Sequence, residues 1–315
     1  MILSCQSICK SFGEKVILQD ASFHIEEREK AALIGNNGAG KTTLLRIIME
    51  EISADSGQVV IAKDKKIGYL AQYQDIHGHH TIYEELMTTK QYILDMEDKI
   101  RSLEQEMKYV VGDKLESLMN SYTRLTHQFE LENGYAYKSE LTGILKGLGF
   151  GEEDFEKPIE TLSGGQKTRV ALGKLLISRP DILLLDEPTN YLDEKHIEWL
   201  RRYLQEYENA FVLISHDIPF LNSVVNLIYN MENQKLDRYV GDYDHFKEVH
   251  AVQKAQIEAA YNRQQQEIAQ LKDFVARNKA RVATRNMAMS RQKKLDRMDV
   301  IELAAEKPKP EFRFL

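Results

Sequence analysis

A glycine-rich stretch that ends in a lysine and two threonines carries the clearest chemistry in the sequence. It consists of Gly35, Asn36, Asn37, Gly38, Ala39, Gly40, Lys41, Thr42 and Thr43. The spacing is G-x-x-x-x-G-K-[ST], between an apolar run at 31–34 and a helical pattern at 44–48. In a strand, glycine turn and helix of this kind, backbone N–H groups converge on a phosphate, the lysine reaches the β- and γ-phosphates and the threonine hydroxyl ligates Mg²⁺. The alternative is a glycine turn that only joins a strand to a helix.

Two later apolar runs also end in ionisable residues. The run at 182–185 is followed by Asp186 and Glu187, and the run at 210–214 leads to His216. The carboxyl ends of parallel strands meet at one edge of a sheet, where open α/β sheets bind ligands, so we expect Lys41, Asp186 and His216 to share that edge. An Asp after such a strand holds the magnesium shell in phosphate-loop sites. A lone His after a strand is usually structural, but this shared edge favours a catalytic role.

Two further features are ambiguous by themselves. Ser163, Gly164, Gly165 and Gln166 form a second glycine turn before a helical pattern, which indicates no more than a helix start. Phe12 lies upstream of the first glycine turn. Its ring could stack on a purine or pack in the core, and spacing leaves both open.

The remaining patterns predict the elements that must position these groups. Residues 1–30, 57–61 and 66–70 read as strands, the first group antiparallel, with Gln72 at the end of the last. Thr81 to Glu84 is a capping box that opens a long helical region. Apolar residues then recur at spacings of three and four over 93–110 and 115–129, with a break at Gly112. These stripes predict an antiparallel helical hairpin.

The C-terminal part combines a helical pattern with concentrated positive charge. From Tyr243 the pattern is helical for about thirty residues with few apolar positions, which is typical of a projecting helix. The segment Lys272 to Arg297 holds nine Lys and Arg against two Asp, a formal charge of +7, whereas the whole chain is at −7. This asymmetry favours contact with nucleic-acid phosphates over a merely solvated face. Leu295, Met298 and Ile301 predict a returning helix, followed by a Lys-Pro linker at 307–310 and a strand at 311–315.

Composition excludes several classes of protein. With 43% hydrophobic and 29% charged residues, the chain can build a core, and it has no apolar run long enough to span a membrane. Its start lacks the pattern of a signal peptide, so we expect a cytoplasmic protein without membrane insertion. Cys5 and Cys9 are expected to be free thiols in a reducing compartment rather than metal ligands.

Taken together, the motifs GNNGAGKTT, Gln72, LSGGQK, ILLLDEPTN, LD and SHD resemble, in residues and order, those of ATP-binding-cassette (ABC) ATPases. The resemblance covers residues 1 to about 240. It implies ATP and Mg²⁺ as cofactors, with Phe12 as the adenine-stacking aromatic, residues 35–43 as the phosphate loop, and Thr42, Gln72 and Asp186 at the metal. It further implies that Glu187 is the general base, that His216 supports the γ-phosphate, that Lys41 and Gln72 assist hydrolysis, and that Asp193 contacts a paired cassette. Residues 163–166 resemble the signature that closes over the γ-phosphate of a facing cassette.

Within that superfamily the chain is similar to the soluble ABC-F proteins, which carry two cassettes joined by a charged helical linker. The similarity rests on the inserted hairpin, on DEPTNYLD followed by Trp199, on the segment 239–243 and on the Arg-rich, Gln-rich C-terminal part. Tyr191, where the family usually has His, and Ile218, where an Arg is common, depart from the pattern. These departures concern the subgroup more than the ATPase chemistry.

The implied fold is an α/β, ABC-type P-loop NTPase domain with an antiparallel β subdomain, an inserted helical hairpin and a projecting helical linker. We expect a cassette at 1–240 with the hairpin at about 81–133, a basic linker at 241–307, and the start of a missing second cassette at 308–315. The implied partners are that second cassette, or a second copy of this chain, and the ribosome or its RNA. The implied function is ATP hydrolysis by an ABC-F-type ATPase that acts on the ribosome, as a translation factor or in antibiotic resistance. The alternative is the ATP-binding subunit of a membrane transporter. The sequence leaves the translation step, any drug, the dimerisation of the chain and the conformation of the linker open.

Overall fold

The computed structural model describes residues 1–71, 79–278 and 285–300, which form two compact units. Unit 1 spans Met1–Tyr243 and unit 2 spans Asp244–Leu315. Gln72 and the predicted linker and strand at 307–315 lie outside the described residues.

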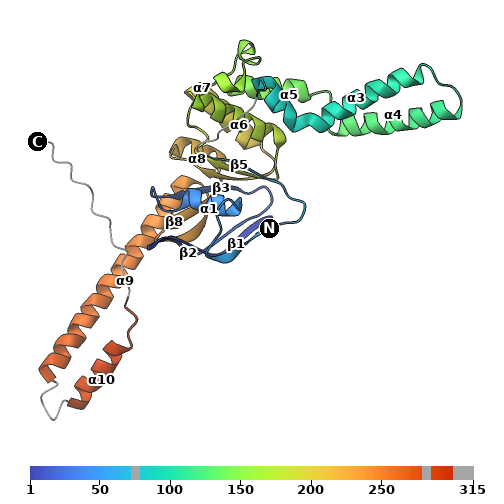
Figure 1. Ribbon diagram of the computed structural model, residues 1–315. Helices are drawn as coiled ribbons and strands as arrows, with labels where there is room; N and C mark the ends of the chain where they lie inside the picture. Colours follow the sequence, from blue (N-terminus) through green and yellow to red (C-terminus); the bar gives the residue numbers. More distant parts are fainter. Residues whose placement is uncertain (72–78, 279–284, 301–315) are drawn as a thin grey trace, which may run out of the picture. The chain divides into compact units, whose positions relative to one another are not determined.

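Unit 1 contains two sheets (Figure 1). The three-stranded sheet has the order β2-β1-β4 and is antiparallel. The six-stranded sheet has the order β5-β6-β7-β3-β8-β9, in which only β9 runs antiparallel to its neighbour. The strands are β1 (Leu3–Phe12), β2 (Lys15–Ile25), β3 (Lys30–Gly35), β4 (Ser56–Ile61), β5 (Ile67–Leu70), β6 (Ile182–Asp186), β7 (Ala210–Ile214), β8 (Leu227–Glu232) and β9 (Lys235–Val240).

The predicted α/β fold with an antiparallel subdomain is therefore confirmed. The central strands β6 and β7 are buried at every position because they are covered on both faces, which explains their unbroken apolar sequence. Strand β3 pairs with β7 on one side and with β8 on the other. The sequence pattern gives no prediction for β8 and β9.

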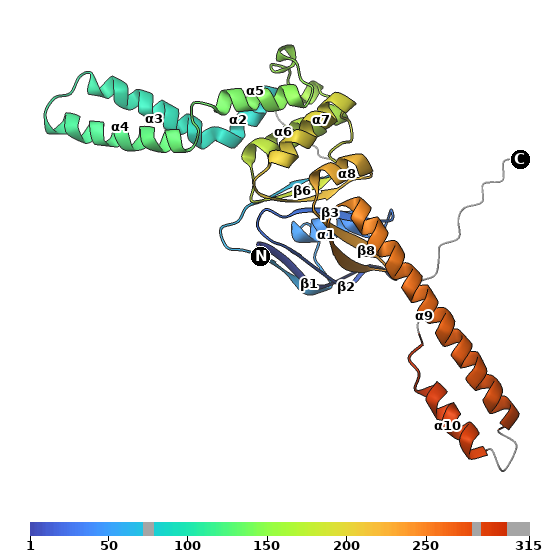
Figure 2. The ribbon, with the colours of Figure 1, turned by 180° about the vertical axis from the view of Figure 1, so that it is seen from behind.

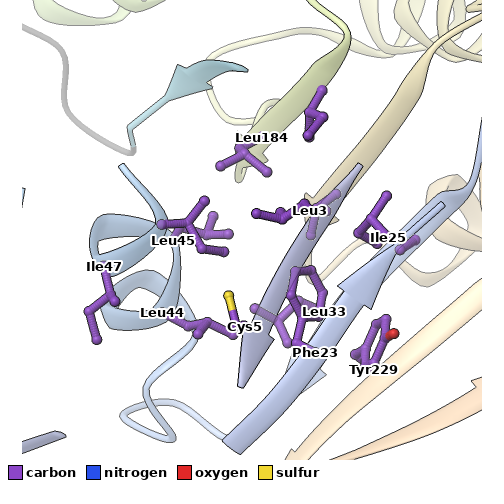
Figure 3. Packing of buried hydrophobic residues seen from close by; sticks show 14 of the residues in the cluster. Leu3, Cys5, Phe23, Ile25, Leu33, Leu44, Leu45, Ile47, Leu184 and Tyr229 are labelled. Atoms are coloured by element: carbon purple, nitrogen blue, oxygen red, sulfur yellow. The ribbon is translucent and has the colours of Figure 1, made fainter. Parts of the chain in front are cut away.

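One hydrophobic core joins both sheets to helix α1 (Figure 3). Leu44 and Leu45 of α1, Leu3 of β1, Phe23 of β2 and Leu184 of β6 belong to it, and each is at most 2% exposed. The helix that follows the glycine loop is thus held between the two sheets. This packing fixes the position of the loop relative to the ends of β6 and β7.

Within residues 1–71 and 79–243, eight α-helices surround or extend from the sheets (Figures 1 and 2). They are α1 (Lys41–Ile48), α2 (Ile82–Met87), α3 (Gln91–Met107), α4 (Asp113–Leu131), α5 (Tyr137–Gly147), α6 (Gly164–Ser178), α7 (Glu194–Glu206) and α8 (Ile218–Val224). Three short 3₁₀ turns accompany them at Thr88–Lys90, Glu152–Asp154 and Ile159–Thr161.

The inserted hairpin consists of α3 and α4, which lie side by side in both ribbon views (Figures 1 and 2). The predicted capping box forms, with the Thr81 hydroxyl accepting from the Glu84 N–H and the Glu84 carboxylate accepting from the Thr81 N–H. Buried apolar residues are found at the base of the hairpin, where Ile93 and Phe129 pack together. At its far end Tyr109 is 86% exposed. The hairpin is therefore anchored at its base.

The described part of unit 2 consists of two helices, α9 (Tyr243–Asn278), which begins at the last residue of unit 1, and α10 (Arg285–Asp296). Lys294 Nζ lies 2.6 Å from Glu267 Oε1, and the guanidinium carbon of Arg291 lies 3.5 Å from the centre of the Phe274 ring. These contacts join α10 to the second half of α9, so the predicted return is confirmed. Its predicted position is wrong, because the helix ends at Asp296, before Met298. Of the apolar residues on which the prediction was based, Leu295 lies at the end of α10 and Met298 lies after it. No helix in the described ranges is long and apolar enough to cross a bilayer.

Candidate active site

The glycine loop connects the end of β3 to the start of α1 as predicted. Its three glycines have φ of +147° at Gly35, +77° at Gly38 and +111° at Gly40. These values lie in the region that L side chains rarely adopt, so the curl of the loop depends on glycine. Asn36 and Asn37 are exposed, and the Ala39 N–H donates to the Asn36 carbonyl at 3.0 Å.

Two of these glycines are also required by close approach. A Cβ at Gly35 would lie 2.5 Å from the carbonyl oxygen of Met231 on β8, and one at Gly40 would lie 2.6 Å from Ile17 Cγ2 on β2. Both distances are shorter than real Cβ contacts. The loop is thus held between a strand of each sheet, and the backbone of α1 begins at a defined place.

Lys41, the first residue of α1, folds back over the loop. Its Nζ donates to the Gly35 carbonyl at 2.8 Å and to the Asn36 carbonyl at 3.3 Å. Burial lowers the pKa of Lys41, against the opposing influence of the Glu187 and Asp186 carboxylates. The ammonium group therefore lies among loop carbonyls and near both acids.

Thr42 and Asp186 come together from two different elements. The Thr42 hydroxyl donates to Asp186 Oδ2 at 2.7 Å, which joins the start of α1 to the end of β6. Asp186 is only 3% exposed, and burial raises its pKa although Thr42, Lys41 and His216 act in the opposite direction. Hydroxyl and carboxylate oxygens are the ligands that Mg²⁺ prefers.

Glu187 follows directly and has a left-handed backbone, with φ of +52°. Its N–H donates to the Ile214 carbonyl at 2.9 Å, which fixes it to the end of β7. His216 approaches the Glu187 carboxylate through its backbone N–H, 3.4 Å from Oε2, and through Nε2, 3.4 Å from Oε1. Burial raises the pKa of Glu187, against the nearby His216.

The buried Oε1 atom of Glu187 has no hydrogen-bond partner among the described residues. A buried carboxylate oxygen without a hydrogen bond is costly unless a donor occupies the position in front of it. Because its pKa is raised, the carboxylate is also a stronger proton acceptor than a free Glu. The arrangement can therefore take a proton from a small molecule, such as water, placed beside Oε1.

Phe12 ends β1 and is 50% exposed, so it is not a core residue. It pairs with Lys15 on β2, two residues from Ile17, the residue that limits the space at Gly40. The exposed ring is therefore carried by the same hairpin that contacts the phosphate loop. This favours the purine-stacking alternative over core packing.

The second glycine turn stands apart from this cluster. Ser163 caps α6, and its side chain accepts from the Gln166 N–H while the Gln166 side chain accepts from the Ser163 N–H. A Cβ on Gly165 would lie 2.9 Å from the Tyr191 ring. None of the contacts described for Ser163, Gly164, Gly165 or Gln166 reaches the phosphate loop.

Asp193 caps α7 and lies on the exposed part of the turn after β6. Its Oδ1 accepts from the His196 N–H at 3.1 Å and is 2.6 Å from His196 Nδ1. The Asp193 side chain is 68% exposed, so it remains accessible to another molecule.

Sequence reasoning missed two residues that contact the site region. Met231 limits the space at Gly35 and Gly40, and Asp55 binds the end of the strand that carries Phe12. Neither belongs to a motif, and both act through contacts across the sheets. For Asp55 the one available signal was its turn position before a predicted strand.

The described residues fit Mg²⁺ and a nucleoside triphosphate. Positive-φ glycines, a lysine and a helix N-terminus form a phosphate cradle, and Thr42 with Asp186 supplies hard oxygen ligands. In the described ranges no group of three or more His, Cys, Asp or Glu could hold a metal by itself.

Comparisons with known proteins agree with this chemistry. The sequence profile of a family described as ABC transporter matches residues 18–190, and a second profile with the same description matches residues 229–314. The chain is 53% identical over 313 residues to an uncharacterized ABC transporter ATP-binding protein, YfmM, of Bacillus subtilis (strain 168), covering 99% of this chain and 60% of the relative. It is 34% identical over 310 residues to ABC transporter F family member 5 of Arabidopsis thaliana, covering 96% and 44%.

A third relative is the probable ATP-binding protein YheS of Escherichia coli (strain K12), at 32% identity over 289 residues, covering 92% of this chain and 44% of the relative. The chain spans about half the length of the curated relatives it matches. Among solved structures, the ATP-binding subunit of an ABC transporter matches with a TM-score of 0.58 at 17% identity, covering 80% of this chain and 94% of that chain. This likeness concerns the fold alone.

Proposed function

Because the chain belongs to the ABC family of ATPases and is of the ABC-F type, we propose that it binds Mg·ATP in the cluster described above and that the full-length protein uses ATP hydrolysis to act on the ribosome. Binding of ATP and its hydrolysis follow from the family. The roles of individual residues, the need for a facing cassette and the ribosome are the proposed part.

Binding begins at the phosphate loop. The N–H groups of residues 35–43 and the start of α1 receive the phosphates, and Lys41 turns from the Gly35 and Asn36 carbonyls toward the β- and γ-phosphates. The Phe12 ring stacks on the purine. Thr42 and Asp186 would hold Mg²⁺, which would neutralise charge on the phosphates. Gln72 is proposed to join this metal and water shell.

Hydrolysis depends on Glu187 and His216. Oε1 of Glu187, which has no hydrogen bond among the described residues, accepts a proton from the attacking water, and the raised pKa of the carboxylate suits that step. His216 lies 3.4 Å from the same atom and supports the γ-phosphate. The single observation that carries the ATPase assignment is the junction of Thr42, Asp186, Lys41, Glu187 and His216 at one edge of the sheet.

A second cassette is proposed to complete the site. The turn at Ser163–Gln166 is capped internally, and its described contacts lead to Tyr191 rather than to the phosphate loop of the same chain. We therefore assign the turn to the γ-phosphate of a facing cassette, either from the remainder of a longer protein or from a second copy. Asp193 is accessible for the contact between them.

The proposed ribosomal role rests on unit 2. Three of its basic side chains, Lys272, Lys293 and Arg297, are exposed, and no ion pair or hydrogen bond involving them is found in the described part of the chain. By contrast, Arg291 stacks on Phe274 and Lys294 binds Glu267. The first group is available for RNA phosphates, and the second stabilises the helix pair.

Two measurements test the proposal. If a facing cassette is needed, the isolated chain binds labelled Mg·ATP, but its turnover per molecule rises with protein concentration. Turnover that is independent of concentration would contradict this part. For the partner, ribosome co-sedimentation of the full-length protein is expected; enrichment with membranes and not with ribosomes would favour the alternative, an ATP-binding subunit of a transporter, which the family description also names.

A further inference from the structure

Asp55 binds three consecutive residues of the strand that carries Phe12. Its backbone N–H donates to the Cys9 carbonyl at 2.9 Å. Its Oδ1 accepts from Lys10 Nζ at 2.8 Å, and its Oδ2 accepts from the Ser11 N–H at 2.7 Å. Asp55 lies just before β4, in the connection from α1, so these bonds span more than forty residues of sequence.

Lys10 connects Asp55 to the aromatic ring. Its side chain is only 10% exposed, and its Nζ lies 5.4 Å from the centre of the Phe12 ring. A lysine this buried requires a partner, and Asp55 supplies it. The cation held at this distance is attracted to the ring and restricts its orientation. The ring is 50% exposed, so part of its surface remains accessible to a base.

We propose that Asp55 is a positioning residue for purine recognition: with Lys10 it fixes the end of β1 and the orientation of the Phe12 ring on which the base stacks. This inference rests on the proposed stacking role of Phe12. The electrostatics agree with the geometry, since the bonds from Lys10 and Ser11 hold the pKa of the Asp55 carboxyl below its usual range.

The location makes Asp55 specific for the base rather than for the phosphates. The described polar contacts of its side chain go to Lys10 and Ser11 of β1, and none reaches the phosphate loop. Lys41 and Thr42 contact Gly35, Asn36 and Asp186, and Gly40 is limited by Ile17 of β2 rather than by β1. Loss of Asp55 should therefore leave the phosphate cradle intact. Base stacking on an aromatic side chain contributes about 1–3 kcal/mol, which corresponds to roughly 5-fold to 150-fold in affinity.

The test uses the isolated chain and two probes, Mg·ATP and Mg·tripolyphosphate, the second of which lacks a base. Asp55→Asn and Lys10→Met are expected to weaken binding of Mg·ATP about fivefold to tenfold, the lower part of the range set by stacking, and to leave binding of Mg·tripolyphosphate unchanged. Phe12→Ala is expected to weaken Mg·ATP at least as much. In the double variant of Phe12→Ala and Asp55→Asn, the loss should equal that of Phe12→Ala alone, because both changes remove one interaction.

Glu51→Ala is the matched control. Glu51 lies in the same connection between α1 and β4, and its side chain is 45% exposed against 46% for Asp55. Like Asp55 it forms an ion pair, but its partner is Arg46 of α1 rather than a residue of β1. It should affect neither probe. Equal weakening of both probes by Asp55→Asn, or additive losses in the double variant, would overturn the inference.

The stacking role of Phe12 and the positioning role of Asp55 are distinguished by different outcomes. If Phe12→Ala leaves Mg·ATP affinity unchanged, the stacking role itself is wrong and the inference falls with it. If Phe12→Ala weakens Mg·ATP but Asp55→Asn and Lys10→Met do not, the stacking role stands and the positioning role of Asp55 is rejected.

Discussion

At the edge of the six-stranded sheet Asp186 is 3% exposed, whereas in the helix pair of unit 2 the side chains of Arg277 and Lys294 are 77% and 60% exposed. Both regions concentrate charge. In the first, each charged group is fixed by neighbours from other elements, as Asp186 is by Thr42. In the second, Arg277 pairs with Asp273 one turn away and Lys294 pairs across the two helices.

The difference shows how the same residue types serve two kinds of chemistry. Charges in a poorly solvated site interact strongly and with defined geometry, and their pKa values shift, as those of Asp186 and Glu187 do. Exposed charges are screened by salt over about 10 Å at 0.1 M, so they contribute attraction summed over many phosphates. A change at one buried group should therefore matter more than a change at one exposed group.

The largest effect is expected for Glu187→Gln. The carboxamide fills the same space but cannot take a proton from water, so turnover should fall by about 10²–10⁴-fold. Mg·ATP affinity should change little, because the proposed phosphate contacts come from other residues. Turnover is measured at the highest protein concentration that the isolated chain permits, and affinity by titration with labelled nucleotide.

Lys41→Ala is the contrasting variant, since it should weaken the binding of Mg·ATP itself. If Glu187→Gln has turnover near that of the unaltered chain, Glu187 is not the general base. Burial and fixed geometry of the Glu187 carboxylate would then have no demonstrated effect on catalysis.

A smaller effect, spread over several residues, is expected in unit 2. Changing Lys272, Lys293 and Arg297 together to Gln should reduce the slope of the logarithm of ribosome affinity against the logarithm of salt concentration by about 2 to 3, at roughly 0.7–0.9 per phosphate contact. Mg·ATP binding should be unchanged. Co-sedimentation of the full-length protein with ribosomes over a range of salt concentrations measures the slope.

A control with the same change of net charge is available in unit 1. Arg46, Arg201 and Arg202 are already paired with Glu51 or Glu198, so their joint replacement by Gln should leave the slope unaltered. Equal effects of the two triple variants would mean that ribosome affinity follows net charge rather than the surface of unit 2.

The smallest effect concerns pH and stability. The folded-state pKa of Asp186 is raised, so the folded chain binds its proton more tightly than the unfolded chain does. Its contribution to the free energy of unfolding therefore becomes unfavourable as the pH rises from the ordinary value of 3.8 through the raised pKa. Asp186→Asn should stabilise the nucleotide-free chain at pH 7, and the gain should shrink as the pH is lowered through that window.

Asp55→Asn should show the opposite sign, because the folded-state pKa of Asp55 is lowered and its charge stabilises the fold above its ordinary value. Denaturant unfolding of both variants at several pH values measures the difference. If Asp186→Asn destabilises the chain at pH 7, the attraction to Lys41 and the bond from Thr42 outweigh the cost of burial.

Much of the fold and of the site could be predicted because the relevant patterns are local. The unbroken apolar runs of β6 and β7 reflect burial on both faces, and the loop glycines reflect backbone angles that other residues rarely adopt. Strand β8 was missed although it is apolar. The reason is that its main role, pairing with β3 and contacting Gly35 through Met231, involves residues about two hundred positions apart.

The sequence by itself determined the chemistry available to this protein: a phosphate loop, an acid pair after a buried strand, a histidine after another, and a separate basic segment. These features can be recognised in the sequence because residue type and spacing alone are enough to indicate a turn, a strand or a charge. Only the tertiary structure decided which groups meet. It placed Thr42 on Asp186, left Glu187 Oε1 without a hydrogen bond among the described residues, and brought Asp55 to the strand that ends in Phe12. Such distances depend on sheet order and on the packing of α1 between two sheets, which no local pattern contains.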